Sequence, residues 1–412
     1  MPLALVQHAW LAMKSVVLAF HYLWARPLAA ALNLLLLTLG LTSMTFLLLV
    51  GHQLDKAFER DLAGIDVVVG AKGSPLQLIL AGVFHMDVPP GNVPLKAVEA
   101  LKAHPQVAKV IPISLGDSFR GFRIVGTSAD YINHYDATFS QGVVWKEPMQ
   151  AVIGSQVAAQ TGFKPGDSFA GSHGLGGTGQ AHGDHRYVVS GVLAASGSVL
   201  DRLILTATES VWQVHEAATA VDESDKKIMQ EERELTLALI QYKTPLAAVT
   251  FPRFINTTTE MQAAAPALEI TRLLNMLGVG IDVMRALAGV LLLTAGLSVF
   301  IALWGAVRER RADLALLRML GASPGKVAAL LLCEALWLAV LATVLGLLAG
   351  QVLVVALGWL LKMDQSVLIN AWAWPAVLWS VPALAFGVAA FAALLPAVSA
   401  YRVSVFELLQ PR

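Results

Sequence analysis

Histidines and a carboxylate gather in one glycine-rich stretch of the sequence, residues 171–186. His173, His182, Asp184 and His185 supply the imidazole and carboxylate groups that bind Zn²⁺ and similar ions. Glycines fill much of the stretch, so metal binding would have to order a flexible loop. No C-x₂-C or H-E-x-x-H spacing fixes a ligand set. The stretch therefore allows two interpretations, a zinc site and a flexible polar loop.

A second group of informative residues is basic and lies between two apolar runs, from Val307 to Ser323. Arginines outnumber acidic residues there, and leucines recur at helical spacing, which predicts a helix with one basic and one apolar face. The apolar face must be buried against the same protein or against a partner protein. If it is a cytoplasmic partner, the residues expected to contact it are Arg308, Arg310, Arg311, Asp313, Leu316, Leu317, Arg318, Leu320 and Gly321.

The sequence from Gly321 to Val327, G-A-S-P-G-K-V, resembles a phosphate-binding loop only superficially. Such a loop needs four residues between its glycines and a Ser or Thr after its Lys, whereas this sequence has three residues and a Val. We interpret it as a helix-capping turn. No other Walker-type sequence occurs, and no Ser-His-Asp, paired-carboxylate or nucleophile-elbow pattern stands out. The sequence thus predicts a protein that is not an enzyme. If the protein uses ATP, a partner must bind the ATP and Mg²⁺.

Two features lie inside the apolar run that follows this turn. Glu334 is an acid at membrane depth, which is costly, so we expect it to face a helix bundle, a cavity or another subunit. We favour a structural contact over proton transfer, because no second intramembrane carboxylate accompanies it. Gly346 and Gly350 form a G-x-x-x-G pattern, which suits close helix packing and is a candidate dimer contact.

The composition of the whole chain indicates a membrane protein. Of its 412 residues, 56% are hydrophobic and only 14% are charged, against about 25% charged in average soluble domains. Lys+Arg and Asp+Glu are balanced at 29 each, which gives no indication of nucleic-acid binding. Four runs are long and apolar enough to cross a bilayer as helices, which takes about 20 residues. They are residues 28–50, 286–307, 327–361 and 375–398.

These spans divide the chain and set its orientation. We expect residues 1–27 to form an interfacial amphipathic helix, residues 308–326 a cytoplasmic helix and residues 399–412 a cytoplasmic tail, because basic residues mark cytoplasmic segments. Residues 362–374 then form a short loop on the outer side. Residues 51–280 form a large outer domain.

The outer region mixes strand and helix patterns. Strand candidates recur from Ile65 to Gln241 and helix candidates from Leu95 to Glu234, and a helix is expected to return toward the membrane from Met261 to Val283. We therefore expect an α+β domain of two subdomains, long enough to bury its own core. The expected fold class is an α-helical membrane protein with four transmembrane helices and a large α+β extracytoplasmic domain inserted between the first and the second.

This layout resembles the MacB/FtsX/LolC class of ABC transporter permeases, that is, the FtsX-like permease family with a MacB-like periplasmic core domain. The most specific similarity is the run from Arg308 to Leu336, R-E-R-R-A-D-L-A-L-L-R-M-L-G-A-S-P-G-K-V-A-A-L-L-L-C-E-A-L. Asp313 stands where the family usually has Glu, and Glu334 occupies the family's acidic position in the next span. The tail from Leu395 to Leu409 is also similar, although Val405 replaces a usual proline.

The resemblance implies a permease subunit of an ABC transporter. In such complexes each protomer docks a cytoplasmic ABC ATPase of the LolD/MacB type through the segment between its second and third spans. ATP hydrolysis moves that segment, and the motion passes through the bundle to the outer domain, which is mechanotransmission. The resemblance further implies a homo- or heterodimer in the bacterial inner membrane, with both termini cytoplasmic and the large domain periplasmic. Membrane lipids are expected partners, and the resemblance also allows a periplasmic accessory protein.

Three functions remain open at this point. The leading hypothesis is a permease that acts on lipoprotein, lipid, peptide or antimicrobial cargo in the cell envelope. The second is a subunit of a zinc-linked ABC transport system in which His173, His182 and His185 sense or transfer the metal. The third is a non-transport, FtsX-like scaffold that regulates an envelope enzyme. Apart from zinc, no cofactor is expected to bind the chain directly, and no nucleic acid is expected as a partner.

Overall fold

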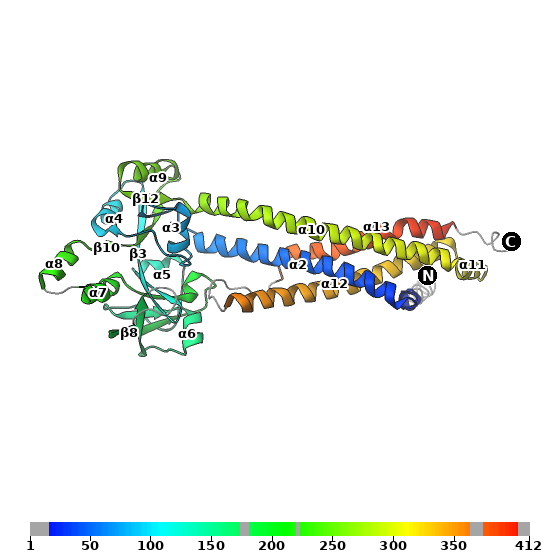
Figure 1. Ribbon diagram of the computed structural model, residues 1–412, viewed down its shortest axis with the longest axis horizontal. Helices are drawn as coiled ribbons and strands as arrows, with labels where there is room; N and C mark the ends of the chain where they lie inside the picture. Colours follow the sequence, from blue (N-terminus) through cyan, green and yellow to red (C-terminus); the bar gives the residue numbers. More distant parts are fainter. Residues whose placement is uncertain (1–15, 174–180, 220–222, 363–373, 403–412) are drawn as a thin grey trace, which may run out of the picture. The chain divides into compact units, whose positions relative to one another are not determined.

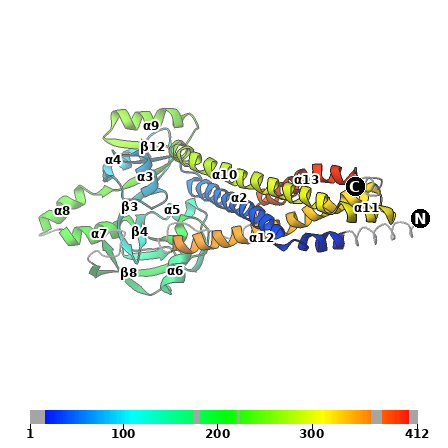
Figure 2. The ribbon, with the colours of Figure 1, turned by 45° about the vertical axis from the view of Figure 1, so that its right-hand side comes forward.

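The structure is a computed structural model, and it describes residues 16–173, 181–219, 223–362 and 374–402 (Figures 1 and 2). Two compact units make up the chain, with boundaries after Leu54 and after Met276. The first unit holds the apolar helices, and the second is an α+β unit. Most of the predicted N-terminal helix, outer loop and cytoplasmic tail lies outside the described residues.

Four helices are long and apolar enough to cross a membrane, as the hydropathy of the sequence predicts. They run alongside one another in both views (Figures 1 and 2). Each of the first three extends past the predicted apolar run, because the polar residues that flank the run continue the helix. The elements are α2 (Pro27–Leu62), α10 (Pro266–Glu309), α12 (Pro324–Lys362) and α13 (Ser380–Tyr401), with the short α11 (Arg311–Met319) after α10 and η2 (Ala376–Trp379) before α13.

Aliphatic and small side chains from all four long helices form the core of the helical unit. Leu37 and Leu41 of α2 and Val299 of α10 are fully buried in it. α12 and α13 contribute many alanines, among them Ala339 and Ala389. Small side chains at these positions let the helix backbones approach closely, which is a main source of attraction between helices in lipid.

The two glycines of the G-x-x-x-G pattern face α2 of the same chain. A Cβ atom on Gly346 would lie 2.7 Å from the Cβ of Leu41, and one on Gly350 would lie 2.5 Å from the Cγ2 of Thr45. Only glycine therefore fits at either position. The close packing expected for this pattern is thus within the chain, and α2 occupies the face that we considered as a dimer contact. Dimerisation itself stays a prediction.

Ten strands of the described outer unit form one sheet in the order β12-β1-β11-β3-β4-β9-β6-β8-β5, and β7 pairs with both β3 and β8. The strands are β1 (Val67–Ala71), β3 (Val107–Phe119), β4 (Phe122–Thr127), β5 (Phe139–Gly142), β6 (Gln150–Ile153), β7 (Ser168–His173), β8 (Ala181–Leu193), β9 (Leu203–Ala207), β11 (Leu237–Tyr242) and β12 (Met261–Ala264). The short strands β2 (Val93–Pro94) and β10 (Glu234–Leu235) pair separately.

Strand β3 belongs to two substructures. Up to Ile113 it pairs with β11, and at Asp117 and Ser118 it pairs with β7. Because β4, β9, β6, β8 and β7 pair in series and β7 returns to β3, these strands close into a barrel. β12, β1 and β11 continue from β3 as an open sheet. The two expected subdomains are therefore an open sheet and a barrel that share one strand.

Helices cover both faces of the open sheet, as the alternation along β1 requires. Val67 and Val69 pack in one core with Phe251 of α9, and Val68 packs in another with Leu78 of α3 (Figure 1). The helices of this unit are α3 (Pro75–Gly82), α4 (Leu95–Lys102), α5 (Asp130–His134), α6 (Ser155–Thr161), α7 (Thr208–Thr219), α8 (Glu223–Glu231) and α9 (Ala247–Thr258), with η1 (Val199–Arg202).

One predicted element is wrong. The segment that begins at Met261 was expected to be helical, but residues 261–264 form strand β12, which pairs antiparallel with β1. Pairing with the sheet edge outweighs the local preference of these residues, as is common for short apolar runs. The helix α10 begins after the strand, at Pro266, where proline suits the first helical turn.

Candidate functional site

The junction between α10 and α11 is a single residue, Arg310. Its backbone leaves the helical conformation, with φ −95° and ψ 16°. The guanidinium donates to Glu334 Oε1 at 3.3 Å and to the carbonyl oxygen of Tyr22 at 3.0 Å, and it lies 4.6 Å from the centre of the Tyr22 ring. Glu334 is only 4% exposed. Glu334 therefore forms a buried contact with the arginine at the helix junction.

Residues 16–24 are helical and lie against the same junction. The indole Nε1 of Trp337, on α12, donates to the carbonyl oxygen of Val16 at 3.0 Å, and its ring lies 5.1 Å from that of Phe20. Arg26 forms an ion pair with Glu309 at the end of α10. The described part of the predicted interfacial helix is thus held by both α10 and α12.

Helix α11 presents two different apolar surfaces. Leu314 is buried, and Leu317 is half-buried against the core of the helical unit. In contrast, Leu316 is 51% exposed, Met319 53% and Leu320 85%. The sequence pattern predicts Leu317 as a partner contact and does not single out Met319, although the spacing of positions 316, 319 and 320 is that of one helix face. We name Leu316, Met319 and Leu320 the α11 outer face.

Charged residues surround the α11 outer face. Arg308, Arg311 and Asp313 are exposed. Gly321 ends the helix with φ +95°, a conformation that glycine adopts without strain. The Ala322 N–H donates to the Leu317 carbonyl oxygen at 3.0 Å, so the segment that resembles a phosphate loop is a capping turn between α11 and α12, as predicted.

The predicted zinc ligands are not tested by the structure. The backbone of His173 belongs to β7, and that of His182, Asp184 and His185 belongs to β8. The side chains of the first three lie outside the described residues, whereas His185 is half-buried. Within the described residues, no group of three or more His, Cys, Asp or Glu side chains is placed to hold a metal ion.

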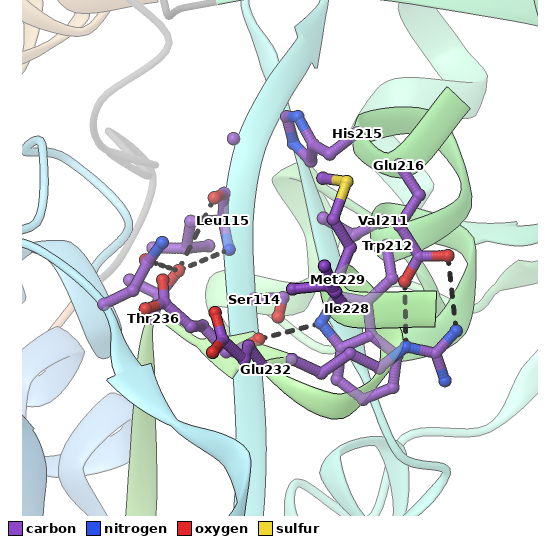
Figure 3. A pocket seen from close by; sticks show the side chains of 14 residues that line it. Ser114, Leu115, Val211, Trp212, His215, Glu216, Ile228, Met229, Glu232 and Thr236 are labelled. Atoms are coloured by element: carbon purple, nitrogen blue, oxygen red, sulfur yellow. Dashed lines mark hydrogen bonds and ion pairs between the residues drawn. The ribbon is translucent and has the colours of Figure 1, made fainter. Parts of the chain in front are cut away.

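A cavity of about 370 Å³ lies in the outer unit beside β3 (Figure 3). The indole Nε1 of Trp212 donates to the Glu234 carbonyl oxygen at 2.8 Å. Arg233 forms an ion pair with Glu216 at 2.9 Å, and its guanidinium lies 4.7 Å from the centre of the Trp212 ring. Sequence reasoning missed this cavity because its walls come from β3, α7, α8 and residues 232–236, which are far apart along the chain.

A buried polar cluster lies elsewhere in the outer unit. His85 is 6% exposed, and its Nε2 lies 2.9 Å from the hydroxyl oxygen of Tyr131 in a hydrogen bond. Burial, with the nearby Arg123 and Arg202, holds the pKa of His85 well below its usual range. Burial also lowers the pKa of Arg123 to about 10, although Asp87 opposes that shift. The imidazole is therefore neutral at physiological pH.

The fold and the helix junction together define a class of protein, a four-helix membrane protein with an inserted α+β domain of periplasmic type. The family profile of the FtsX-like permease C-terminal region matches residues 285–405. The profile of the MacB-like periplasmic core domain matches residues 30–240, and this second match alone covers more than half of the 412 residues. The chain belongs to the MacB/FtsX-type family of ABC transporter permeases. Members of this family are permease components that typically work with a cytoplasmic ABC ATPase.

Two solved structures are similar to about half of the chain at low sequence identity. The periplasmic region of MacB from Actinobacillus actinomycetemcomitans is 10% identical, covers 53% of this chain and 96% of its own, and has a TM-score of 0.35. The extracellular domain of the noncanonic ABC-type transporter YknZ from Gram-positive bacteria is 12% identical. The match covers 48% of this chain and 98% of that domain, with a TM-score of 0.30. Among curated proteins, none matches the chain.

Proposed function

We propose that this permease converts ATP hydrolysis by a separate ATPase into motion of its outer domain, which acts on lipoprotein, lipid, peptide or antimicrobial cargo in the cell envelope. The supporting observation is the continuity of α10, which contributes Leu303 to the core of the helical unit and Ile270 to a core of the outer unit. α2 likewise contributes Leu41 to the first and Phe58 to the second. An unbroken helix is stiff, so displacement of one part of it displaces the other.

The cytoplasmic side of the mechanism begins at α11. Only Arg310 separates α11 from α10, and the contacts of Arg310 with Glu334 and Tyr22 connect the same point to α12 and to residues 16–24. A force on α11 would therefore act on three helical segments together. The α11 outer face offers exposed apolar anchors for an ATPase, and the exposed Arg311 offers charge recognition.

The topology follows from the same assignment. Docking of a cytoplasmic ATPase at α11 places the junction and both termini in the cytoplasm, and it places the inserted domain on the far side of the inner membrane, in the periplasm. The basic residues Arg308, Arg310, Arg311 and Arg318 support this orientation by the positive-inside rule. A dimer of permease protomers completes the proposed complex.

Docking is tested by co-purification with the ATPase. The double variant Leu316→Asp/Leu320→Asp changes only the α11 outer face and should lose most of the bound ATPase, because buried apolar anchors dominate affinity. The matched control, Leu246→Asp/Val249→Asp, changes two aliphatic side chains of the outer unit that are 71% and 73% exposed. ATPase recovery that is equal in both variants and in the wild type would refute the docking assignment.

Transmission is tested by distances between spin labels in the complex with the ATPase. One label replaces Glu99 of α4 and the other replaces Trp359 of α12, both of which are exposed, in a Cys333→Ala background. We expect ATP to change the distance distribution, and a Gly-Gly insertion after Met276 in α10 to abolish that change while the ATPase stays bound. A distribution that ATP leaves unchanged in the wild-type complex would contradict mechanotransmission.

A further inference from the structure

The geometry points to the cavity beside β3 as a binding site for a small cationic amphipathic ligand, such as a lysine side chain next to an aliphatic residue of a peptide. We call it the β3 cavity. Its lining includes Ser114, Val211, Ile228, Met229 and Glu232, which Figure 3 labels, and also Glu234. Its volume of about 370 Å³ is within the range of small-molecule sites, which is about 300–1,000 Å³. The statement that this ligand is cargo rests on the proposed function, whereas the statement that the ligand binds the cavity does not.

The cavity lies where β3 changes its partner strand. The ladder with β11 ends at Ile113, and the pairing with β7 begins at Asp117. Between them the Leu115 N–H donates to the side-chain oxygen of Thr236 at 2.9 Å instead of to a strand. Places where neighbouring strands diverge leave crevices in a sheet, and ligand sites in proteins are concave. The cavity is therefore a consequence of the topology.

Ser114 supplies a buried polar group in the wall of the cavity (Figure 3). The residue is only 4% exposed, and its hydroxyl is accessible from the cavity that it lines. A hydroxyl is both a donor and an acceptor of hydrogen bonds. The N–H of a ligand ammonium group or amide would donate to the hydroxyl oxygen.

The charges of the lining select a cation. Arg233 is already paired with Glu216 and lies over the Trp212 ring, so its positive charge is compensated. Glu232 and Glu234 also line the cavity, and neither forms an ion pair with a residue in the described part of the chain. Within the described lining, these two exposed carboxylates have no ion-pair partner, which favours a cationic ligand over an anionic one.

Apolar side chains of the lining favour an aliphatic group in the ligand, next to its ammonium group. Val211 of α7 is buried, and Ile228 and Met229 of α8 line the cavity beside it (Figure 3). These side chains suit an aliphatic group of a few carbon atoms. An ammonium group near the carboxylates with an aliphatic group on this wall is the arrangement that satisfies both halves of the lining.

The test uses the full-length protein in nanodiscs and the radiolabelled dipeptide Leu-Lys, blocked at both ends, in equilibrium dialysis. We expect saturable binding at one site per chain. Glu232→Gln/Glu234→Gln should weaken binding at least about tenfold through loss of the charges, and Ile228→Trp should weaken it similarly by filling the cavity. The controls Glu231→Gln and Gln230→Trp change exposed positions of the same helix outside the lining and should bind as the wild type does.

Three results would overturn the inference. They are the absence of saturable binding, equal binding of blocked Leu-Glu, and unchanged affinity in the lining variants when thermal unfolding shows them folded. None of these results depends on the ATPase. If the permease docks its ATPase normally but fails this test, the inference about the ligand site is wrong and the proposed function still stands.

Discussion

Arg310 and Glu334 form a 3.3 Å ion pair between the junction of α10 and α11 and the interior of α12, although 24 positions separate them in sequence. Their side chains are only 15% and 5% exposed. A buried pair of this kind fixes the geometry of the groups that it joins more than it adds stability, because desolvation offsets much of the attraction. We therefore expect the pair to set the direction in which α11 leaves α10.

Removal of both partners of this ion pair should cost less stability than the two single removals added together. Arg310→Met leaves Glu334 buried without its partner and should lower the free energy of unfolding by about 3 kcal/mol, with a similar loss for Glu334→Gln. The double variant Arg310→Met/Glu334→Met should lose less than the sum of the two. The measurements are thermal unfolding in detergent and ATP hydrolysis by the complex. Additive losses would show that the two side chains do not interact.

The close contact of α12 with α2 predicts that Gly350 and Gly289 respond differently to substitution by alanine. Gly350→Ala places a Cβ within 2.5 Å of Thr45 and should lower the free energy of unfolding by about 1–3 kcal/mol through overpacking. Gly289→Ala, in α10, adds a Cβ that meets nothing within 4 Å of its described surroundings and should be neutral or stabilising, because alanine favours a helix. Equal unfolding temperatures for the two variants would contradict the packing.

Because the His85 imidazole is buried and neutral, we expect the folded protein to lose stability in acid. Because its pKa is lowered in the folded state, the unfolded chain binds a proton below about pH 6.5 that the folded chain does not bind. Its contribution to stability is constant above that pH and falls by about 1.4 kcal/mol per pH unit below it, until the folded-state pKa is reached. His134, whose pKa burial also lowers, acts in the same direction.

The substitution that isolates this effect is His85→Asn. Asparagine tolerates the positive φ of 54° at this position and does not titrate. Unfolding temperatures at pH 7.5 and pH 5.5 should differ less for His85→Asn than for the wild type, with His134→Gln as a comparison for the second histidine. If the wild type and His85→Asn lose equal stability over this range, the buried imidazole is not the titrating group.

Zinc titration distinguishes the leading hypothesis from the metal-linked one. Because no C-x₂-C or H-E-x-x-H spacing fixes a ligand set, we expect the wild type to bind Zn²⁺ no more tightly than about micromolar. His182→Ala/His185→Ala should then behave as the wild type does. Tighter binding that this double variant abolishes would establish a metal site and favour the zinc-linked hypothesis.

Hydropathy predicted the spans but not the full helices. The apolar run of residues 28–50 marks where α2 can cross a bilayer, whereas the helix continues to Leu62 past the charged residues Asp55, Lys56, Glu59, Arg60 and Asp61. Membrane insertion depends on apolar length, but a helix ends only where caps or tertiary contacts end it. The periodicity of α11 likewise predicted an apolar face without separating Leu317, which faces the helical core, from Leu320, which faces outward.

Long-range pairing accounts for what the sequence did not predict in the outer unit. The stretch from Met261 to Ala264 becomes a strand because β1 offers it an edge, and closure of the barrel depends on β7 meeting β3 at Asp117. Neither contact leaves a local pattern. The β3 cavity has the same origin, because Ser114 and Ile228 come together only when β3 and α8 take their places.

The strand that the open sheet and the barrel share also determines how the outer unit comes apart. Ile113 completes the ladder of one substructure, and Asp117, four positions later, completes that of the other, so loss of either ladder leaves part of β3 without its partner. Local opening should therefore spread through both halves as a single cooperative event. Backbone amides along residues 107–119 would then exchange with solvent at nearly the global unfolding rate, and a proteolytic fragment that ends within β3 would not fold.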